Sequence, residues 1–433
     1  MFEEMIQRVQ QAQTVSYTGK IENIVGMSIE ASGGRAAVGD ICRIYNGESG
    51  GQVMAEVVGF KNDHMLLMPY SDMSGISAGN FVRNTGKRLS LNMGPFLKGR
   101  VINALGQPID GKGPFHGGTP FCVDGNSYIN PMARPPIRER LEFGIKAIDG
   151  MLTVGKGQRI GIFAGSGVGK STLMGMIAKH VKADINVIAL VGERGREVLE
   201  FMEKDLGPEG MSRSVLVVAT SDQPAMLRKR CPSVATGVAE YFRDQGYDVL
   251  LMMDSLTRFA MAQREIGLAV GEPPVARGYT PSIYSELPKL LERSGNFQRG
   301  SITGVYTVLV EGDDTNEPIA DTVRGILDGH IVLSRRLANS NHFPAIDVGA
   351  SISRLMNDIV SPEHRQMAAR IRDVMGIYEK NSDLVSIGAY KAGTNPKLDY
   401  ALSKIDGIQQ FLMQGVQEGF TYEQDLELMG KLL

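Results

Sequence analysis

The 433-residue sequence contains no tryptophan, only three cysteines and no long apolar run. Cys42, Cys122 and Cys231 lie far apart and match no metal-binding spacing, so we expect reduced, buried thiols of a cytosolic protein. No apolar run approaches the ~18 residues of a membrane span, and the first residues lack the basic-then-apolar order of a signal peptide. We therefore expect neither membrane insertion nor secretion.

The chain also lacks an excess of either charge, because 46 Lys and Arg residues face 48 Asp and Glu residues. This balance argues against a surface built entirely for nucleic acid. Glycine, by contrast, is abundant at 52 residues, and no collagen-like or low-complexity period accounts for it. We expect these glycines where the backbone needs φ > 0 or where another segment approaches closely.

The length predicts about three domains, since a domain averages roughly 150 residues. The first predicted domain, residues 1–95, begins with an apolar helix face formed by Phe2, Met5, Ile6 and Val9. This short helix either packs on its own domain or binds a partner or a membrane surface.

In the rest of the chain the pattern of predicted secondary structure changes twice. Short strand patterns separated by glycine-rich turns continue to about residue 91 and predict a small closed β-barrel. Across residues 96–350, apolar strand patterns alternate with amphipathic helical stretches, which predicts an α/β domain with a parallel sheet covered on both faces. Residues 351–433 lose the strand pattern after about Ser353 and predict a terminal helical domain.

The strongest local pattern begins at Ala164 and reads AGSGVGKST. It follows a predicted strand and opens a predicted helix, as a phosphate-binding P-loop requires. Backbone N–H groups of such a loop surround phosphates, and the helix N-terminus adds positive potential. Lys170 would neutralise the β- and γ-phosphates, and the Ser171 hydroxyl would coordinate Mg²⁺. Ala164 replaces the usual first glycine, and it is small enough for the turn. The predicted nucleotide-binding residues of the loop are Gly165, Ser166, Gly167, Val168, Gly169, Lys170, Ser171 and Thr172.

Two carboxylates stand at the ends of other predicted strands. Asp254 can hold the Mg²⁺ shell through water, although an aspartate at this place is also a common helix N-cap. Glu193 can orient and polarise the attacking water if its strand neighbours the P-loop strand. Its alternative is a solvated glutamate in a charged loop.

Longer segments carry a resemblance to a known family. The P-loop block, GERGREV, DSLTRFAMAQREIGLAVGEPP, VLVEGDDTNEPIAD and HFPAIDVGASISR together resemble the catalytic subunits of rotary ATPases. Within that family they are most similar to the type III secretion ATPases. The segments DSLTRFAMAQREIGLAVGEPP, VLVEGDDTNEP and IGAYKAGTNPKLD resemble the flagellum-specific export ATPases more than their injectisome relatives.

The resemblance implies a RecA-like P-loop core between an N-terminal β-barrel and a C-terminal helical domain, assembled as a homo-hexameric ring. It implies Mg²⁺-dependent ATP hydrolysis that energises flagellar type III protein export; an injectisome ATPase or the catalytic subunit of a rotary ATP synthase is the alternative. A non-catalytic ring subunit is disfavoured because such subunits lack the carboxylate at Glu193. The implied roles are a catalytic carboxylate at Glu193, a Walker B aspartate at Asp254, γ-phosphate contacts from Arg194 and Arg258, an arginine finger at Arg354 and adenine contacts from Phe343 and Tyr422.

The resemblance also implies partners and a location. These are the flagellar export apparatus, a regulatory stator-like protein, a stalk-like coiled coil, and export substrates with their chaperones. The expected place is cytoplasmic, peripheral at the inner face of the cell membrane at the export gate. We expect no nucleic-acid partner, because aromatic-rich basic strands are absent from the N-terminal region, and we expect the basic cluster 228–230 to be a solvated face.

Overall fold

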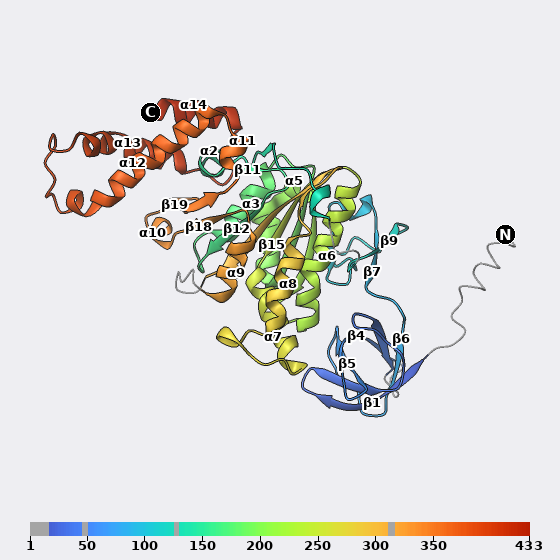
Figure 1. The fold of residues 1–433 in the computed structure, drawn as a ribbon. Helices are drawn as coiled ribbons and strands as arrows, with labels where there is room; N and C mark the ends of the chain where they lie inside the picture. Colours follow the sequence, from blue (N-terminus) through green and yellow to red (C-terminus); the bar gives the residue numbers. More distant parts are fainter. Residues whose placement is uncertain (1–16, 46–50, 125–129, 311–316) are drawn as a thin grey trace.

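The computed structural model describes residues 17–45, 51–124, 130–310 and 317–433, which form three regions in a row (Figure 1). A β-barrel lies at one end, a large sheet with its helices in the middle, and the last helices at the other end. The predicted helix at the start of the chain lies outside the described residues. No helix within the described ranges is both long and apolar enough to cross a bilayer.

The barrel closes through six strands in the order β1-β2-β5-β4-β3-β6. Side chains alternate between the two faces of a strand, so Ile21, Ile29, Ile44, Val57 and Leu67 point inward and are buried. This confirms the predicted barrel. Its strands are β1 (Thr18–Val25), β2 (Ser28–Ser32), β3 (Ile41–Tyr45), β4 (Gln52–Lys61), β5 (His64–Pro69) and β6 (Phe81–Asn84).

The middle region is built on a sheet with the strand order β19-β18-β12-β17-β15-β13-β14-β8. From β8 to β18 every neighbouring pair is parallel, and β19 adds an antiparallel edge. The strands are β8 (Val101–Asn103), β12 (Arg159–Ala164), β13 (Ile185–Glu193), β14 (Ser214–Thr220), β15 (Asp248–Asp254), β17 (Ser301–Leu309), β18 (Gly329–Leu333) and β19 (Ile346–Ser353), with β16 (Gly295–Asn296) paired to β17.

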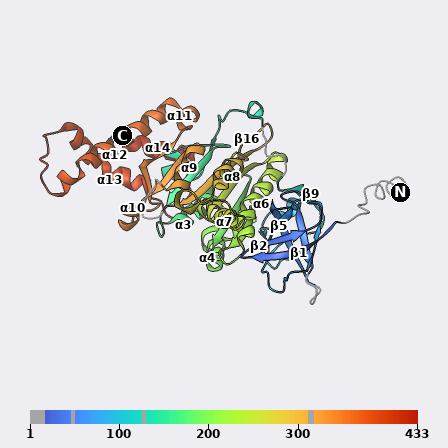
Figure 2. The ribbon, with the colours of Figure 1, turned by 60° about the horizontal axis from the view of Figure 1, so that its bottom comes forward.

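Helices cover both faces of this sheet, as the sequence pattern predicts (Figures 1 and 2). Strand β13 shows why: Val187 and Ala189 belong to one apolar cluster, whereas Ile188 and Leu190 belong to the other. The first cluster includes α6 (Ala225–Asp244), α7 (Leu256–Ala269), α8 (Pro281–Leu291) and α9 (Pro318–Ile326). The second includes α2 (Lys146–Met151), α3 (Lys170–His180), α4 (Gly195–Glu200) and the π-helical η3 (Phe201–Leu206).

Short elements complete the described part of the chain. They are β7 (Ser90–Met93), η1 (Pro95–Leu97), β9 (Thr119–Cys122), η2 (Pro131–Ala133), β10 (Arg140–Leu141), β11 (Val154–Gly155), α5 (Gly207–Ser212), η4 (Ala276–Gly278) and α10 (Arg335–Asn339).

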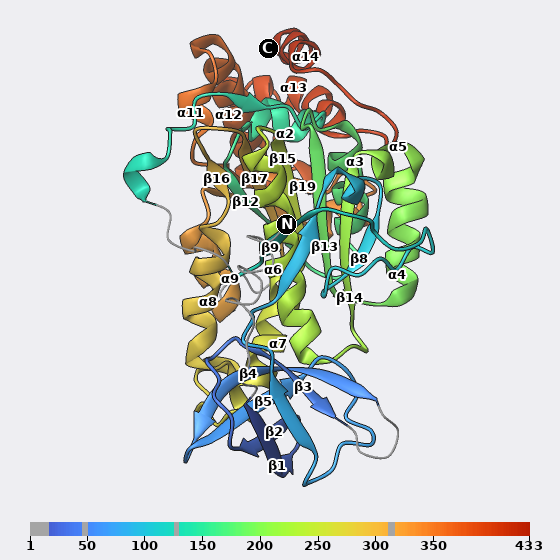
Figure 3. The same ribbon diagram turned by 90° about the vertical axis from the view of Figure 1, so that its right-hand side faces the viewer.

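The C-terminal helices pack on the second face of the central region, next to α2 (Figure 3). Side chains cap the N-termini of the three long ones, and Thr421 forms a capping box with Gln424 at α14. The helices are α11 (Met356–Ile359), α12 (Pro362–Ser386), α13 (Pro396–Leu412) and α14 (Tyr422–Leu432).

Two expectations, one about the burial of the cysteines and one about the backbone at the glycines, are wrong in part. Cys42 and Cys231 are buried, but Cys122 is exposed because it ends β9, whose side chains largely face solvent. Many glycines do have positive φ or a close neighbour, yet Gly325 and Gly376 have neither, so packing does not require glycine there.

The basic cluster 228–230 is not a solvated face. The Arg230 guanidinium is buried at the junction of α6 with the barrel and pairs with Glu56 and Asp124. Arg228 pairs with Glu265 on α7. The charges are used inside the molecule because α6 packs on the barrel, which the local sequence could not reveal.

Candidate nucleotide-binding and catalytic site

The P-loop connects β12 to α3 in the predicted way. Gly167 and Gly169 have φ values of 76° and 90°, a region that favours glycine. Helix α3 begins at Lys170, so its first N–H groups face the loop and can bind phosphate oxygens. Val168 is buried and anchors the loop, whereas Ser166 is exposed at its tip and Ser171 is exposed at the helix start.

Lys170 meets both predicted carboxylates. Its Nζ donates a hydrogen bond to Asp254 and lies 3.6 Å from Glu193 Oε1. Thr307 on β17 donates a second hydrogen bond to Asp254, with 2.7 Å between the oxygens. The strands are parallel, so their carboxyl ends share one edge of the sheet, which is where open α/β sheets bind ligands.

The strand order corrects one expectation about Glu193. Strand β13 does not neighbour the P-loop strand β12, because β17 and β15 lie between them. The Lys170 side chain covers this gap by extending across the sheet edge to the ends of β15 and β13. Because the lysine side chain is long, Lys170 can contact Glu193 even though β13 is not adjacent to β12.

Burial and mutual charge set the protonation of this cluster. Burial opposes the charge of Lys170, but Asp254 and Glu193 outweigh it and raise the lysine pKa. Burial, followed by repulsion from Asp254, raises the pKa of Glu193 to about 7. A hydrogen bond with Glu193 lowers the pKa of Glu197, which lies in the first turn of α4. Glu193 is thus poised to exchange a proton near neutral pH.

The two predicted γ-phosphate arginines differ in setting. The Arg194 side chain is 77% exposed and makes a 3.5 Å ion pair with Glu197, so it is free to swing toward a ligand. Arg258, in the first turn of α7, packs against Gly192, where a Cβ would lie 3.1 Å from its own Cβ. Its buried Nε has no hydrogen-bond partner among the described residues, which leaves an unused donor next to the end of β13.

Phe343 lies beside the P-loop. A Cβ on Gly169 would come within 3.5 Å of the Phe343 ring, and the Phe343 side chain remains 40% exposed. An exposed ring face next to the phosphate loop can stack on a nucleotide base.

The structure does not support the adenine contact expected of Tyr422. Its side chain is 5% exposed, and its ring lies under the Arg140 guanidinium at 3.8 Å. Its hydroxyl bonds to His364 Nδ1 at 2.8 Å. Tyr422 is held inside the junction of α14 and α12 because α14 starts there, a packing that the loose C-terminal pattern did not show.

Arg354 and the P-loop lie at opposite ends of the parallel strands: the P-loop follows the C-terminal end of β12, and Arg354 lies at the N-terminal end of β18. Strand β19 is antiparallel to β18, and Ser353 pairs with Gly329 at the start of β18. The Arg354 N–H bonds to the Asp328 carbonyl at 3.0 Å, and its side chain is exposed. The five residues of β18 separate the two ends by about 16 Å, so Arg354 cannot reach phosphates bound in its own P-loop.

The available ligands suit Mg²⁺. Ser171 and Asp254 offer oxygen atoms, the donors that Mg²⁺ prefers. No group of three or more His, Cys, Asp or Glu residues in the described ranges has metal-binding geometry. Mg²⁺ usually binds through one or two protein oxygens together with substrate phosphates, so the residues fit a metal carried by a nucleotide.

Sequence reasoning missed three residues of this site. Thr307 sits in an unremarkable apolar strand, and Glu197 is one of several charges in its run; neither gave a usable signal. Gln414, just after α13, donates its backbone N–H to the Phe343 carbonyl at 2.9 Å. Its only signal was a polar residue interrupting the apolar face at the end of a predicted helix.

Three family models match the chain. The ATP synthase alpha/beta family matches with its beta-barrel domain over residues 21–86 and its nucleotide-binding domain over residues 144–353. The T3SS EscN ATPase C-terminal domain matches residues 360–431.

Curated relatives and solved structures agree with these matches. The flagellum-specific ATP synthase of Bacillus subtilis is 53% identical over 99% of this chain and 98% of its own length. The type 3 secretion system ATPase of Xanthomonas euvesicatoria is 48% identical over 95% of this chain and 93% of its own. The assembled ATPase EscN of the enteropathogenic E. coli type III secretion system superimposes with a TM-score of 0.91 at 46% identity, covering 96% of this chain and 99% of that one.

The family matches span all three regions, and the site carries the P-loop lysine together with both carboxylates. Relatives of this kind are ATPases, which supports ATP hydrolysis by this chain rather than a purely structural place in a ring. The chain belongs to the ATP synthase alpha/beta family, in the branch of flagellar and type III secretion ATPases.

Proposed function

We propose that this chain is the ATPase subunit of a flagellar type III export system, and that it works as a homo-hexameric ring. The observation that carries the hydrolytic part is the cluster of Lys170, Asp254 and Glu193 at one edge of the sheet. The relatives named flagellum-specific ATP synthase and the three segments that resemble flagellar export ATPases support the flagellar assignment. An injectisome ATPase is the second candidate, because relatives of that kind are also 46–48% identical.

Substrate binding would rearrange the charges of the cluster. Triphosphate oxygens compete with Asp254 and Glu193 for the Lys170 ammonium. When Lys170 turns to the phosphates, Glu193 loses a positive neighbour that lowers its pKa and becomes a stronger base. Glu193 then takes a proton from water as the water oxygen bonds to the γ-phosphorus and the bond to ADP breaks.

Ser171 and Asp254 are the residues that would hold Mg²⁺ with the nucleotide. The metal, when bound there, would supply positive charge against the phosphate oxygens. Backbone N–H groups from Gly165 to Thr172 bind the phosphates, and Phe343 stacks on the adenine. Arg258 offers its unpaired Nε–H, and Arg194 its mobile guanidinium, to the γ-phosphate.

Arg354 requires a neighbouring subunit. Arg354 is exposed at the N-terminal end of the parallel strands, too far from the P-loop to contact phosphates bound in the same subunit. As an arginine finger it would complete the site of the next subunit in the ring. Such a finger contributes about 10³- to 10⁵-fold to turnover in comparable NTPases. Isolated subunits should therefore hydrolyse ATP slowly.

The remaining partners follow from the same family. EscN is known in complex with its central stalk EscO, which supports a stalk-like coiled coil as a partner of this ring. The other proposed partners are a stator-like regulator, the export apparatus, and export substrates with their chaperones. The proposed location is the cytoplasm, at the inner face of the membrane beside the export gate.

The variant Glu193→Gln tests the catalytic assignment. It keeps the shape of the side chain and removes the base, so we expect turnover to fall about 10²- to 10⁴-fold while ATP binding persists. Glu200→Gln on α4 is the matched control, since the Glu200 carboxylate is 41% exposed and pairs with Arg196 and Lys204. Unchanged turnover in Glu193→Gln would refute the catalytic role. Undiminished secretion of flagellar subunits by cells that carry only this variant would refute the flagellar role.

A further inference from the structure

Gln414 joins the C-terminal region to the base side of the nucleotide site. It lies two residues after the end of α13, and its backbone N–H bonds to the Phe343 carbonyl at 2.9 Å. Its side-chain Oε1 accepts from the Lys146 N–H at 2.9 Å. Its Nε2 donates to the carbonyls of Gly144 and Glu418 at 2.8 and 2.7 Å. One residue thus bonds to Phe343, to the start of α2 and to its own loop.

These bonds give both polar atoms of the side-chain amide partners in a buried place. Gln414 is 6% exposed, and both of its N–H groups and its oxygen have partners inside the protein. Without the side chain, the buried Gly144 carbonyl, the partly buried Glu418 carbonyl and the buried Lys146 N–H would each lose a partner, and unsatisfied buried groups are costly. The segment between α13 and α14 is therefore held in one position by this amide.

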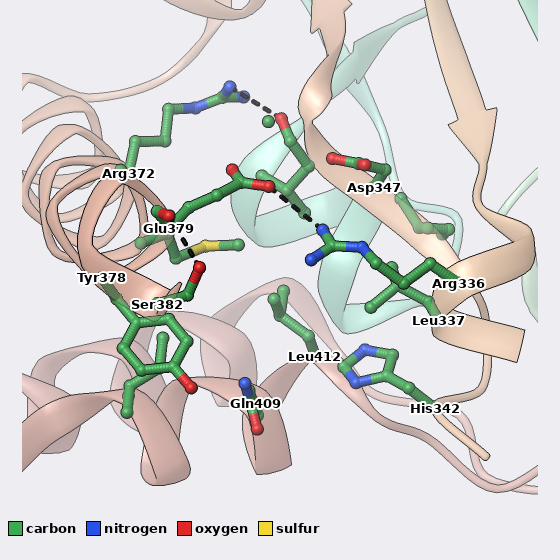
Figure 4. Close-up of a pocket in the computed structure, with 16 residues that line it drawn as sticks. Arg336, Leu337, His342, Asp347, Arg372, Tyr378, Glu379, Ser382, Gln409 and Leu412 are labelled. Atoms are coloured by element: carbon green, nitrogen blue, oxygen red, sulfur yellow. Dashed lines mark hydrogen bonds and ion pairs between the residues drawn. The ribbon is translucent and has the colours of Figure 1, made fainter. Parts of the chain in front are cut away.

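The neighbouring interface is loose by comparison. A cavity of about 390 Å³ separates α10 and β19 from α12 and α13, and Figure 4 shows His342 and Leu412 on its wall. The ion pair that crosses it, Arg336 with Glu379, has side chains that are 72% and 64% exposed, and such pairs contribute little. Hydrogen bonds within the central region hold the residues on either side of Phe343, and the Gln414 N–H adds the bond that ties Phe343 to the C-terminal region.

We infer that Gln414 is a positioning residue for the nucleotide base: it holds Phe343 in its stacking position and makes base affinity depend on the docking of the C-terminal helices. The inference rests on the proposed function, in which Phe343 stacks on adenine. It deepens that function by giving the C-terminal region a route to nucleotide affinity.

Calorimetric titration of the purified full chain with ADP and, separately, with inorganic tripolyphosphate tests this inference, with Mg²⁺ present throughout. Gln414→Met removes the side-chain bonds at similar volume. We expect it to weaken ADP binding about two- to ten-fold, the worth of one aromatic stacking contact, and to leave tripolyphosphate affinity unchanged. Gln414→Glu keeps the acceptor and loses the donated bonds, so it should show the same selectivity if the Met variant does not fold.

Two further variants complete the design. Gln409→Met, which replaces an exposed glutamine in the last turn of α13, should bind both ligands like the parent chain. Phe343→Leu should weaken ADP selectively, and if it does not, the stacking proposal and this inference fall together. If Phe343→Leu is selective but the Gln414 variants bind ADP normally, or lose both ligands equally, only the role of Gln414 is overturned.

Discussion

Replacing Arg230 tests how the barrel is attached to the central region. The Arg230 Nε lies 2.8 Å from Glu56 Oε2, and its Nη1 lies 2.6 Å from Asp124 Oδ1. The side chains of Arg230 and Glu56 are only 7% and 5% exposed, and Tyr70 donates a further hydrogen bond to Glu56. The carboxylate of Glu56 is therefore charged in a dry place because the guanidinium is present.

The variant Arg230→Met leaves Glu56 buried with a single neutral partner, Tyr70. Breaking a buried ion pair in this way costs about 3–5 kcal/mol. The double variant with Glu56→Gln removes both charges and still gives Tyr70 an acceptor. We therefore expect the double variant to lose about 1–3 kcal/mol less than the sum of the single variants, as is typical of groups in direct contact.

Urea unfolding followed by circular dichroism measures these differences, provided the dependence on urea is the same for all variants. Arg228→Met is the matched control two residues away on α6. Its partner Glu265 is 37% exposed, so we expect a loss of at most about 1 kcal/mol. Equal losses for the two arginines, or strictly additive losses in the double variant, would refute the buried junction.

Three further predictions concern protonation and assembly. Because burial raises the pKa of Glu193 to about 7 and the base must be ionised, kcat/KM should fall about ten-fold below its plateau by pH 6; a flat profile from pH 8 to 6 contradicts this. Burial raises the pKa of Asp425 from 3.8 to about 8, so the folded chain holds a proton that the unfolded chain releases, and stability falls as pH rises between these values. Asp425→Asn should raise the unfolding temperature at pH 8.5, and no change there would mean that the carboxyl is solvated. Mixing the inactive Glu193→Gln and Arg354→Ala variants should restore turnover, since one site can combine both intact residues from two subunits; no recovery would place Arg354 outside the neighbour's site.

Much of the fold could be predicted because local sequence patterns indicate where strands and helices form. Short strand patterns between glycine-rich turns marked the barrel strands, and continuous apolar runs marked β12, β13 and β15 as strands covered on both faces. The order of those strands could not be predicted, since no local pattern records which neighbour a strand chooses. For that reason the expectation that β13 lies next to β12 was wrong, although Glu193 still reaches Lys170.

The candidate site divides in the same way. The P-loop could be recognised in the sequence because its backbone conformation favours glycine at Gly167 and Gly169, independently of the rest of the fold. The resemblance implies an adenine contact for Tyr422 that the structure does not support, and little in the sequence marks Gln414. Both positions depend on how α13 and α14 dock, which involves residues more than 50 positions away in the chain, such as His364.

The sequence by itself determined the phosphate loop, the secondary structure and, through its longer segments, the family. Only the tertiary structure decided which carboxylates meet Lys170, which arginine of the cluster 228–230 is buried, and that Arg354 cannot serve its own site. The physical reason is range: backbone geometry and side-chain periodicity act over a few residues, whereas burial and charge pairing depend on which distant segments the strand order brings together.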